Sequence, residues 1–151
     1  MPRLTRLPFV FTENPVYFIT ACTQGRRPLL SNPETHAVFR DFCILARDHG
    51  VLVGRYVLMP DHLHLFVCIP PGDIGLSAWM KSLKNALSKH WRGQGIKSPH
   101  WQKGFFDHLL RHDESHAEKW KYAQDNPVRA GLVASHADWP FAGIIQPDSG
   151  L

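Results

Sequence analysis

Cysteine is scarce in this sequence of 151 residues, and its three cysteines are far apart. Cys22, Cys43 and Cys68 lie in apolar runs, and no C-x-x-C pair occurs, which argues against a zinc knuckle or a redox motif. Isolated cysteines of this kind indicate reduced thiols rather than a disulfide framework. We therefore expect a cytoplasmic protein whose stability comes from its hydrophobic core, because a chain of this length can bury one without cross-links.

Long apolar runs are also missing. No stretch approaches the roughly 18 apolar residues of a membrane span. The N-terminal segment MPRLTRLPFVFTENP has a short apolar patch and no small-residue cleavage site, so we expect no secretory signal. Hydrophobic residues make up 44% of the chain, as in an ordinary globular protein. These features predict a single domain over residues 1–151 with no membrane partner.

Acidic residues are absent from Ile74 to Phe106, although the net charge of the whole chain is only +4. This stretch instead carries Lys81, Lys84, Lys89, Arg92, Lys97 and Lys103. A long stretch of one charge sign is a better indicator of a polyanionic partner than the total charge. A solvated helix face followed by a loop is the alternative interpretation.

Periodic apolar residues outline the elements. Strands are expected at 16–23, 51–59, 62–69 and within 101–111, because β-branched and aromatic residues dominate there. The first helix should begin with a capping box formed by Ser31 and Glu34 and end at Gly50. Its apolar positions are Val38, Phe39, Phe42 and Leu45.

Two more helices are predicted farther along the chain. One spans about Ile74 to Arg92 and should bury Leu76, Trp79, Met80, Leu83 and Leu87, which have helical spacing. The other covers 113–126 and should end near Asn126, because Pro127 disfavours helical conformation in the residue before it. The order β-α-β-β-α-β-α predicts an α+β, ferredoxin-like antiparallel sheet with helices on one face, plus a C-terminal helix.

Two histidines stand in the strand YVLMPDHLHLFVCIP (residues 56–70). Side chains alternate along a strand, so His62 and His64 share one face, whereas Leu63 and Leu65 share the other. Two neighbouring imidazoles suit a divalent cation that keeps open positions for substrate oxygens. A pair of half-exposed histidines bound to water or to neighbours is the alternative, because an H-x-H sequence also occurs by chance.

Tyrosine is rare as well, with three in the chain. Tyr17 and Tyr56 lie in strand runs and are expected to pack in the sheet. Tyr122 lies in the polar helical segment KWKYAQDNP, and Asn126 follows four residues later on the same helix face. This pair could supply a nucleophile and an oxygen ligand; alternatively, Tyr122 packs at the sheet edge and Asn126 caps the helix.

Several segments of the sequence, taken together, resemble a known protein family. The segments YVLMPDHLHLFV, WMKSLKNALSKHW, HWQKGFFDHLLR, KYAQDNPVRAGLV and DWPFAG follow one another between about Val16 and Gly143. In this order they resemble the REP-associated tyrosine transposases, relatives of the single-tyrosine insertion-sequence transposases in the HUH endonuclease superfamily. An H-x-H after MPD, combined with a later Tyr-x-x-x-Asn-Pro-Val, is much more specific than either motif alone.

The resemblance implies a metal-dependent enzyme that nicks and joins single-stranded DNA at hairpins. It implies that His62, His64 and Asn126 hold Mg²⁺ or Mn²⁺, and that Tyr122 is the nucleophile that forms a 5′-phosphotyrosyl link. If the protein has this activity, we expect the DNA backbone to contact Lys81, Lys84, Lys89, Arg92 and Lys97. His90, Trp91 and Trp101 could stack on unpaired bases, although Trp79 and Trp91 also follow the apolar stripe typical of core residues.

Two alternatives to a nickase remain at this point. One is a protein that binds DNA hairpins without cleaving them; the other is a hydrolytic phosphoesterase that uses metal-bound water and does not need Tyr122. Either a monomer or a homodimer is compatible with the sequence.

Overall fold

The computed structural model describes residues 15–70, 75–111 and 113–151. The N-terminal segment examined for a secretory signal, apart from Pro15, and most of the expected chain break at 70–73 lie outside these residues. The strands are β1 (Val16–Cys22), β2 (Leu52–Leu58), β3 (His62–Cys68), β4 (Phe106–Leu110) and β5 (Ala142–Ile144). The α-helices are α2 (Pro33–Ala46), α3 (Leu76–Gly93), α4 (Asp113–Gln124) and α5 (Asn126–Arg129).

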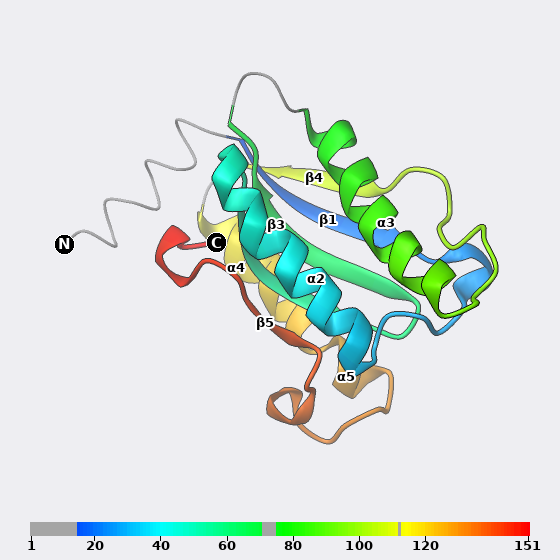
Figure 1. Ribbon diagram of the computed structural model, residues 1–151. Coiled ribbons are helices and arrows are strands. Elements are labelled where there is room, and N and C mark those ends of the chain that lie inside the picture. Colours follow the sequence, from blue (N-terminus) through cyan, green and yellow to red (C-terminus); the bar gives the residue numbers. More distant parts are fainter. Residues whose placement is uncertain (1–14, 71–74, 112) are drawn as a thin grey trace.

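All five strands form one sheet in the order β4-β1-β3-β2-β5, and every neighbouring pair is antiparallel (Figure 1). The four longer strands and the two helices α2 and α3 confirm the predicted ferredoxin-like arrangement. The strand expected within 101–111 is shorter, because only Phe106–Leu110 pairs along β1 while Trp101 forms an isolated bridge with Thr23. β3 lies in the middle of the sheet, which places the histidine strand at its most enclosed position.

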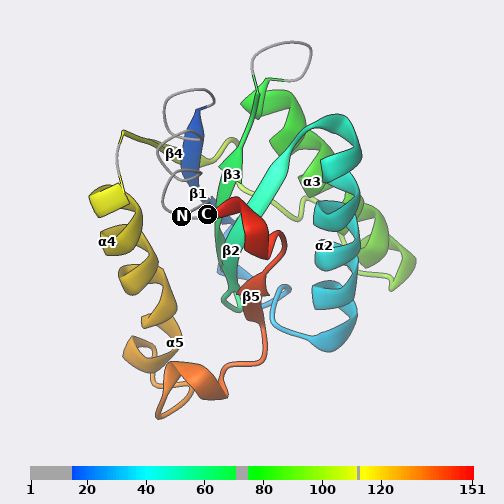
Figure 2. The ribbon, with the colours of Figure 1, turned by 90° about the vertical axis from the view of Figure 1, so that its left-hand side faces the viewer.

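The helices form two layers, one on each side of the sheet. Figure 2 shows α2 and α3 on one side and α4 with α5 on the other. The α2/α3 layer covers the larger hydrophobic cluster, which includes Leu63, Leu65 and Val67 from β3. The α4 layer covers a smaller cluster, to which β3 contributes Phe66 and Cys68. Alternate side chains of β3 therefore belong to the two different clusters, as the alternation in the sequence predicted.

The start of α2 differs from the expected capping box at Ser31. Asn32 is the N-cap, and its side-chain oxygen accepts a hydrogen bond from the Thr35 amide at 2.9 Å. This register places Pro33 in the first turn, where its missing N–H costs nothing. The helix then continues into a 3₁₀ turn that ends at Gly50, whose φ of +80° is the left-handed conformation expected at a helix stop.

Most, but not all, of the predicted core positions are buried. Phe39, Trp79, Met80, Leu83 and Leu87 are buried, as helical spacing predicted. Leu45, an apolar position of α2 at the same helical spacing, is instead 62% exposed. Helical spacing identified the apolar side of α2, but it did not show how much of that side the neighbouring elements bury.

The C-terminal region contains two short elements that the sequence did not indicate. The third helix ends at Gln124, close to the expected end near Asn126, and Asn126 itself opens the short helix α5. Pro127 is compatible with this, because proline is tolerated in the first turn of a new helix. Farther on, β5 adds an edge strand by pairing with β2. Among the described residues, no helix is both long and apolar enough to cross a bilayer.

Candidate active site

The two histidines of β3 lie on the face of the sheet that α4 covers. In the sheet register His62 is opposite Cys22 and His64 is opposite Thr20, both on β1. Their ring centroids are 4.9 Å apart, and the rings are nearly perpendicular. The expected placement of both imidazoles on one face is thus confirmed.

His62 is held by a carboxylate from the turn before its strand. Its Nδ1 lies 2.8 Å from Oδ1 of Asp61, and Nε of Arg26 donates to Oδ2 of the same carboxylate at 2.9 Å. Burial would raise the pKa of Asp61, but the hydrogen bonds from His62 and Arg26 outweigh it and hold the pKa below its usual value. Asp61 is therefore an anion that fixes the orientation of the His62 ring, as carboxylates do for metal-binding histidines.

His64 is more deeply enclosed and is 6% exposed. Its Nδ1 lies 2.9 Å from the hydroxyl of Thr20, and its ring stacks on Phe18 with centroids 5.2 Å apart. Burial, followed by the charge of nearby His62, lowers the pKa of His64 to about 3. The ring is therefore neutral at physiological pH, which is the form that binds metal ions.

Asn126 completes the cluster from the other side. Its Nδ2 lies 3.0 Å from Nε2 of His62 and 3.3 Å from Nε2 of His64. This network is satisfied when both rings carry their proton on Nδ1, leaving Nε2 as acceptor toward Asn126. Residues separated by more than 60 positions in the sequence thus direct polar atoms to one point.

These three side chains fit a divalent cation of the Mg²⁺ or Mn²⁺ type. Both Nε2 lone pairs are directed to the same place, and a half-turn of the Asn126 amide would exchange its nitrogen for the oxygen that such cations prefer. Among the described residues, no group of three or more His, Cys, Asp and Glu side chains is arranged to hold a metal. A cation at this site would therefore rely on an amide as its third protein ligand.

Tyr122 lies in the last turn of α4 and is 60% exposed. Two other residues of the helix, Trp120 and Ala123, pack against the sheet, so the phenol belongs to a different side of α4. Cζ of Arg129 lies 4.1 Å from the centroid of the Tyr122 ring. The expectation that Tyr17 and Tyr56 pack in the sheet is confirmed, since Tyr56 is fully buried and Tyr17 packs against the larger cluster.

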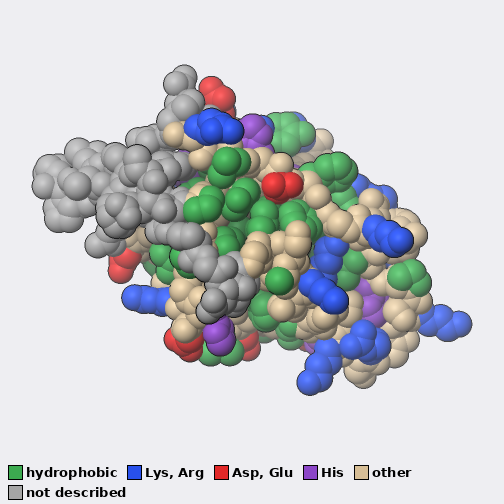
Figure 3. All heavy atoms as spheres, turned by 90° about the horizontal axis from the view of Figure 1, so that it is seen from above, with side chains coloured by type: hydrophobic (Ala, Val, Ile, Leu, Met, Phe, Trp, Pro, Cys, Tyr) green, Lys and Arg blue, Asp and Glu red, His purple; other side chains and the backbone are tan. Residues whose placement is uncertain are grey.

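The residues expected to contact DNA lie on a different part of the surface. Lys81, Lys84 and Arg92 line a groove of about 480 Å³ between α3 and the 98–105 segment, together with Lys103. Lys89 and Lys97 are exposed outside this lining. Figure 3 shows Lys and Arg side chains gathered at the end of the molecule where α3 and the loop after it lie.

Lys84 has a structural function within this groove. Its ammonium group donates to the carbonyl oxygens of Gln102 and Gly104, and it lies 5.7 Å from the centroid of the Trp101 ring. Partial burial lowers the pKa of Lys84 from its usual value. Lys84 thereby fastens the loop to α3, while Lys81 and Arg92 remain exposed.

Trp79 and Trp91 are core residues rather than stacking platforms. Trp79 is 4% exposed and Trp91 is fully buried, with its indole N–H donating to Thr35 at 3.1 Å. Base stacking on Trp91 is therefore excluded. Trp101 is half-buried, and its indole N–H donates to the Lys84 carbonyl.

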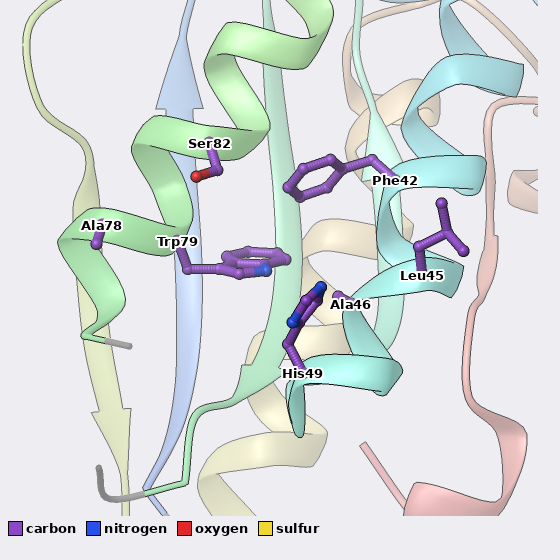
Figure 4. A pocket seen from close by; sticks show the side chains of 7 residues that line it. All are labelled: Phe42, Leu45, Ala46, His49, Ala78, Trp79 and Ser82. Atoms are coloured by element: carbon purple, nitrogen blue, oxygen red, sulfur yellow. The ribbon is translucent and has the colours of Figure 1, made fainter. Parts of the chain in front are cut away.

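A second concavity lies between α2 and α3 (Figure 4). Its volume is about 420 Å³, and Phe42 of α2, Trp79 of α3 and His49 of the 3₁₀ turn after α2 project into it. No residue predicted for metal binding, catalysis or DNA contact lines it. This groove belongs to the helix layer opposite the histidine pair.

The sequence did not indicate several residues that hold the site together. Asp61 directly precedes His62, so its adjacency was a usable signal. Arg26 reaches Asp61 from a turn 35 residues earlier, with an unusual φ of +56° for a residue other than glycine. Arg129 lies in the short helix α5, which the sequence did not indicate.

Comparison with known proteins identifies the family of this chain. Residues 12–122 match the family described as "Transposase IS200 like". A REP-associated tyrosine transposase of Escherichia coli is 25% identical over 132 residues, covering 87% of this chain and 78% of the relative. A relative from Haemophilus influenzae with a similar description is 27% identical and covers 89% of this chain and 82% of its own.

Solved structures give the same result. A structure described as a REP-associated tyrosine transposase bound to a REP hairpin superposes with a TM-score of 0.71 at 27% identity, covering 85% of this chain and 75% of that one. A transposase from Deinococcus radiodurans superposes with a TM-score of 0.53 at 21% identity, covering 74% and 90%, and supports the fold alone. With a family match over most of its length, this chain belongs to the IS200-like transposase family.

Proposed function

We propose that this protein is a metal-dependent, single-strand-specific DNA endonuclease and strand transferase that acts at DNA hairpins of repetitive extragenic palindromes. The observation that carries the proposal is the convergence of His62 and His64 on Asn126, whose Nδ2 lies 3.0 Å and 3.3 Å from their Nε2 atoms. That cluster lies on the same face of the sheet as α4, the helix that presents Tyr122. A protein that only binds hairpins has no need of this arrangement.

The chain's own residues prepare the metal site. Asp61 orients His62, while Thr20 and the stacked ring of Phe18 hold His64, so that neither imidazole needs to reorganise on binding. A bound Mg²⁺ or Mn²⁺ would polarise the scissile phosphate and offset its developing charge. Burial keeps His64 neutral, which leaves its Nε2 lone pair available.

Tyr122 supplies the nucleophile in this proposal. Its phenolic oxygen forms a bond to phosphorus as the bond from phosphorus to the 3′ oxygen breaks. The phenol proton goes to solvent or a base, and the leaving 3′ oxygen takes up a proton to become a free 3′-OH. The product is a 5′-phosphotyrosyl link, so a second 3′-OH can reverse the step and join strands without an external energy source.

The basic loop after α3 is connected to the metal site through a short series of contacts. The His100 carbonyl accepts from the Gln24 amide, and the Asp61 carbonyl accepts from the Thr23 amide. Arg27 donates to the Lys97 carbonyl at 2.7 Å. In this proposal, DNA bound by the exposed Lys81, Lys89, Arg92 and Lys97 continues around the end of the sheet to His62, while Lys84 holds the loop in place.

A covalent-adduct experiment tests the proposal. A single-stranded hairpin taken from repeats flanking the gene is labelled on the 3′ side of its cleavage region and incubated with Mn²⁺. The products are then separated on a denaturing protein gel. We expect label to migrate with the wild-type protein, to be absent for Tyr122→Phe and to be strongly reduced for His64→Ala. Tyr17→Phe is the matched control, because it removes a hydroxyl from a strand tyrosine far along the chain from α4.

Two results would contradict the proposal. Salt-sensitive hairpin binding without any adduct, across several flanking hairpins, would indicate a binding protein. Cleavage that persists in Tyr122→Phe would instead indicate hydrolysis by metal-bound water.

A further inference from the structure

The short helix α5 connects the candidate metal site with the candidate nucleophile. Its first residue, Asn126, contacts both histidines, and its last residue, Arg129, contacts Tyr122. These two residues are three positions apart, so they lie on neighbouring parts of the same turn. One rigid turn of helix therefore sets the position of an amide ligand and of the tyrosine ring together.

Arg129 holds Tyr122 at two points. Its guanidinium carbon lies 4.1 Å from the ring centroid, within the range of a cation–π contact. One of its N–H groups also donates to the backbone carbonyl of Tyr122 at 2.7 Å. A planar guanidinium that is fixed to the backbone presents a defined face to the ring, which the flexible ammonium of lysine does not do.

The exposure of Tyr122 makes this contact important. With 60% of the residue exposed, the side chain would otherwise be free to change rotamer. A nucleophile must lie close to its target in a near-attack arrangement, and a displacement of about 1 Å can cost 10²-fold in rate.

We propose that Arg129 is a positioning residue that clamps the Tyr122 ring so that its hydroxyl faces the scissile phosphodiester of single-stranded DNA at the site formed by His62, His64 and Asn126. This inference rests on the proposed function. Arg129 adds to it a defined orientation of the nucleophile and a positive charge beside an anionic substrate.

The contact itself is tested by ¹⁹F NMR of protein labelled with 3-fluorotyrosine. The chain has three tyrosines, so three signals are expected, and Tyr122→Phe assigns one of them. In Arg129→Met we expect the Tyr122 signal to move toward that of a solvent-exposed fluorotyrosine and to narrow. Arg55→Met is the matched control, because it removes a guanidinium 5.6 Å from the Trp120 ring on the same helix.

The role in the reaction is tested by the rate of adduct formation. At saturating hairpin we expect Arg129→Met to be roughly 10- to 100-fold slower, with the half-saturating DNA concentration changed by less than about twofold, as a positioning role requires. Arg129→Lys should remain slow, because it keeps the charge but not the planar face. Arg55→Met should react at the wild-type rate.

Three results would overturn the inference: an unchanged Tyr122 signal in Arg129→Met, an equal loss of rate in Arg55→Met, or a wild-type rate in Arg129→Lys. The NMR experiment and the rate experiment test different claims, so either can fail while the other succeeds. If the wild-type protein forms no adduct, the proposed function fails, and the NMR signal alone decides whether Arg129 holds the ring.

Discussion

The face of the sheet under α2 and α3 and the face under α4 share the central strand β3, yet they carry different kinds of side chain. On the α2/α3 face, β3 contributes Leu63, Leu65 and Val67, all fully buried in the larger cluster. On the α4 face it contributes His62 and His64, beside a smaller apolar cluster. The α2/α3 face supplies most of the buried apolar area, and the α4 face presents polar atoms at defined positions.

This difference shows how one strand can serve stability and chemistry at once. Backbone hydrogen bonds and the packed leucines fix β3 on one side, so the imidazoles on the other need little further support. What support they need is polar and specific, from Asp61 and Thr20. Substitutions on the two faces should therefore have separable effects.

The largest effect on stability should come from the apolar face. Leu65→Ala removes a fully buried side chain and should lower the free energy of unfolding by about 2–5 kcal/mol. His62→Ala, on the same strand but partly exposed, should cost only about 1 kcal/mol through its lost hydrogen bonds. Urea unfolding of both variants measures the difference. Equal losses would show that the histidine face is as important for stability as the leucine face.

The next effect concerns metal affinity on the polar face. Asp61→Asn keeps the shape of the side chain but removes the anion that orients His62. Loss of such a partner weakens metal binding by about 10- to 100-fold. Mn²⁺ titration followed by EPR measures this, with the exposed Asp41→Asn on α2 as control. Wild-type Mn²⁺ affinity in Asp61→Asn would show that Asp61 does not support metal binding at this site.

A smaller effect is expected for DNA binding at the groove beside α3. Lys81 is exposed and lines this groove. If it contacts a phosphate, Lys81→Ala should reduce the slope of log affinity against log salt by about one unit. Fluorescence anisotropy with a labelled hairpin gives this slope, and Arg47→Ala at the end of α2 provides a control outside the groove. An unchanged slope would place the DNA elsewhere.

The smallest effect should be the pH dependence contributed by two of the three buried thiols, one on each side of the sheet. Burial raises the pKa of Cys68, in β3 under α4, to about 11, and raises that of Cys43, on the buried side of α2, even further. Because the unfolded chain releases these protons near pH 9 and the folded chain retains them, stability should fall as pH rises above about 9.

Urea midpoints measured between pH 8 and 10.5 test this dependence. Cys43→Ala and Cys68→Ala should each flatten the curve relative to wild type over that range. Curves with the same slope in all three proteins would show that other groups govern the alkaline loss of stability.

Much of the framework could be predicted from local patterns. The period of two in residues 62–69 correctly placed both histidines on one face and the leucines on the other, because alternation is a property of the extended backbone itself. Helical spacing likewise located α2 and α3. Turn chemistry was less decisive, since Ser31 and Asn32 are both good caps and the structure uses Asn32.

The sequence by itself determined the order of the first four strands and of the helices α2, α3 and α4, and the shared face of His62 and His64. It also supplied the candidate residues for a metal and a nucleophile. Only the tertiary structure decided that Asn126 leaves the tyrosine helix and reaches both imidazoles, that Arg26 holds Asp61, and that Arg129 covers Tyr122. The physical reason is the range of the forces involved. Backbone conformation follows from neighbouring residues, whereas a contact across 35 or 64 residues exists only after the sheet and its two helix layers have packed.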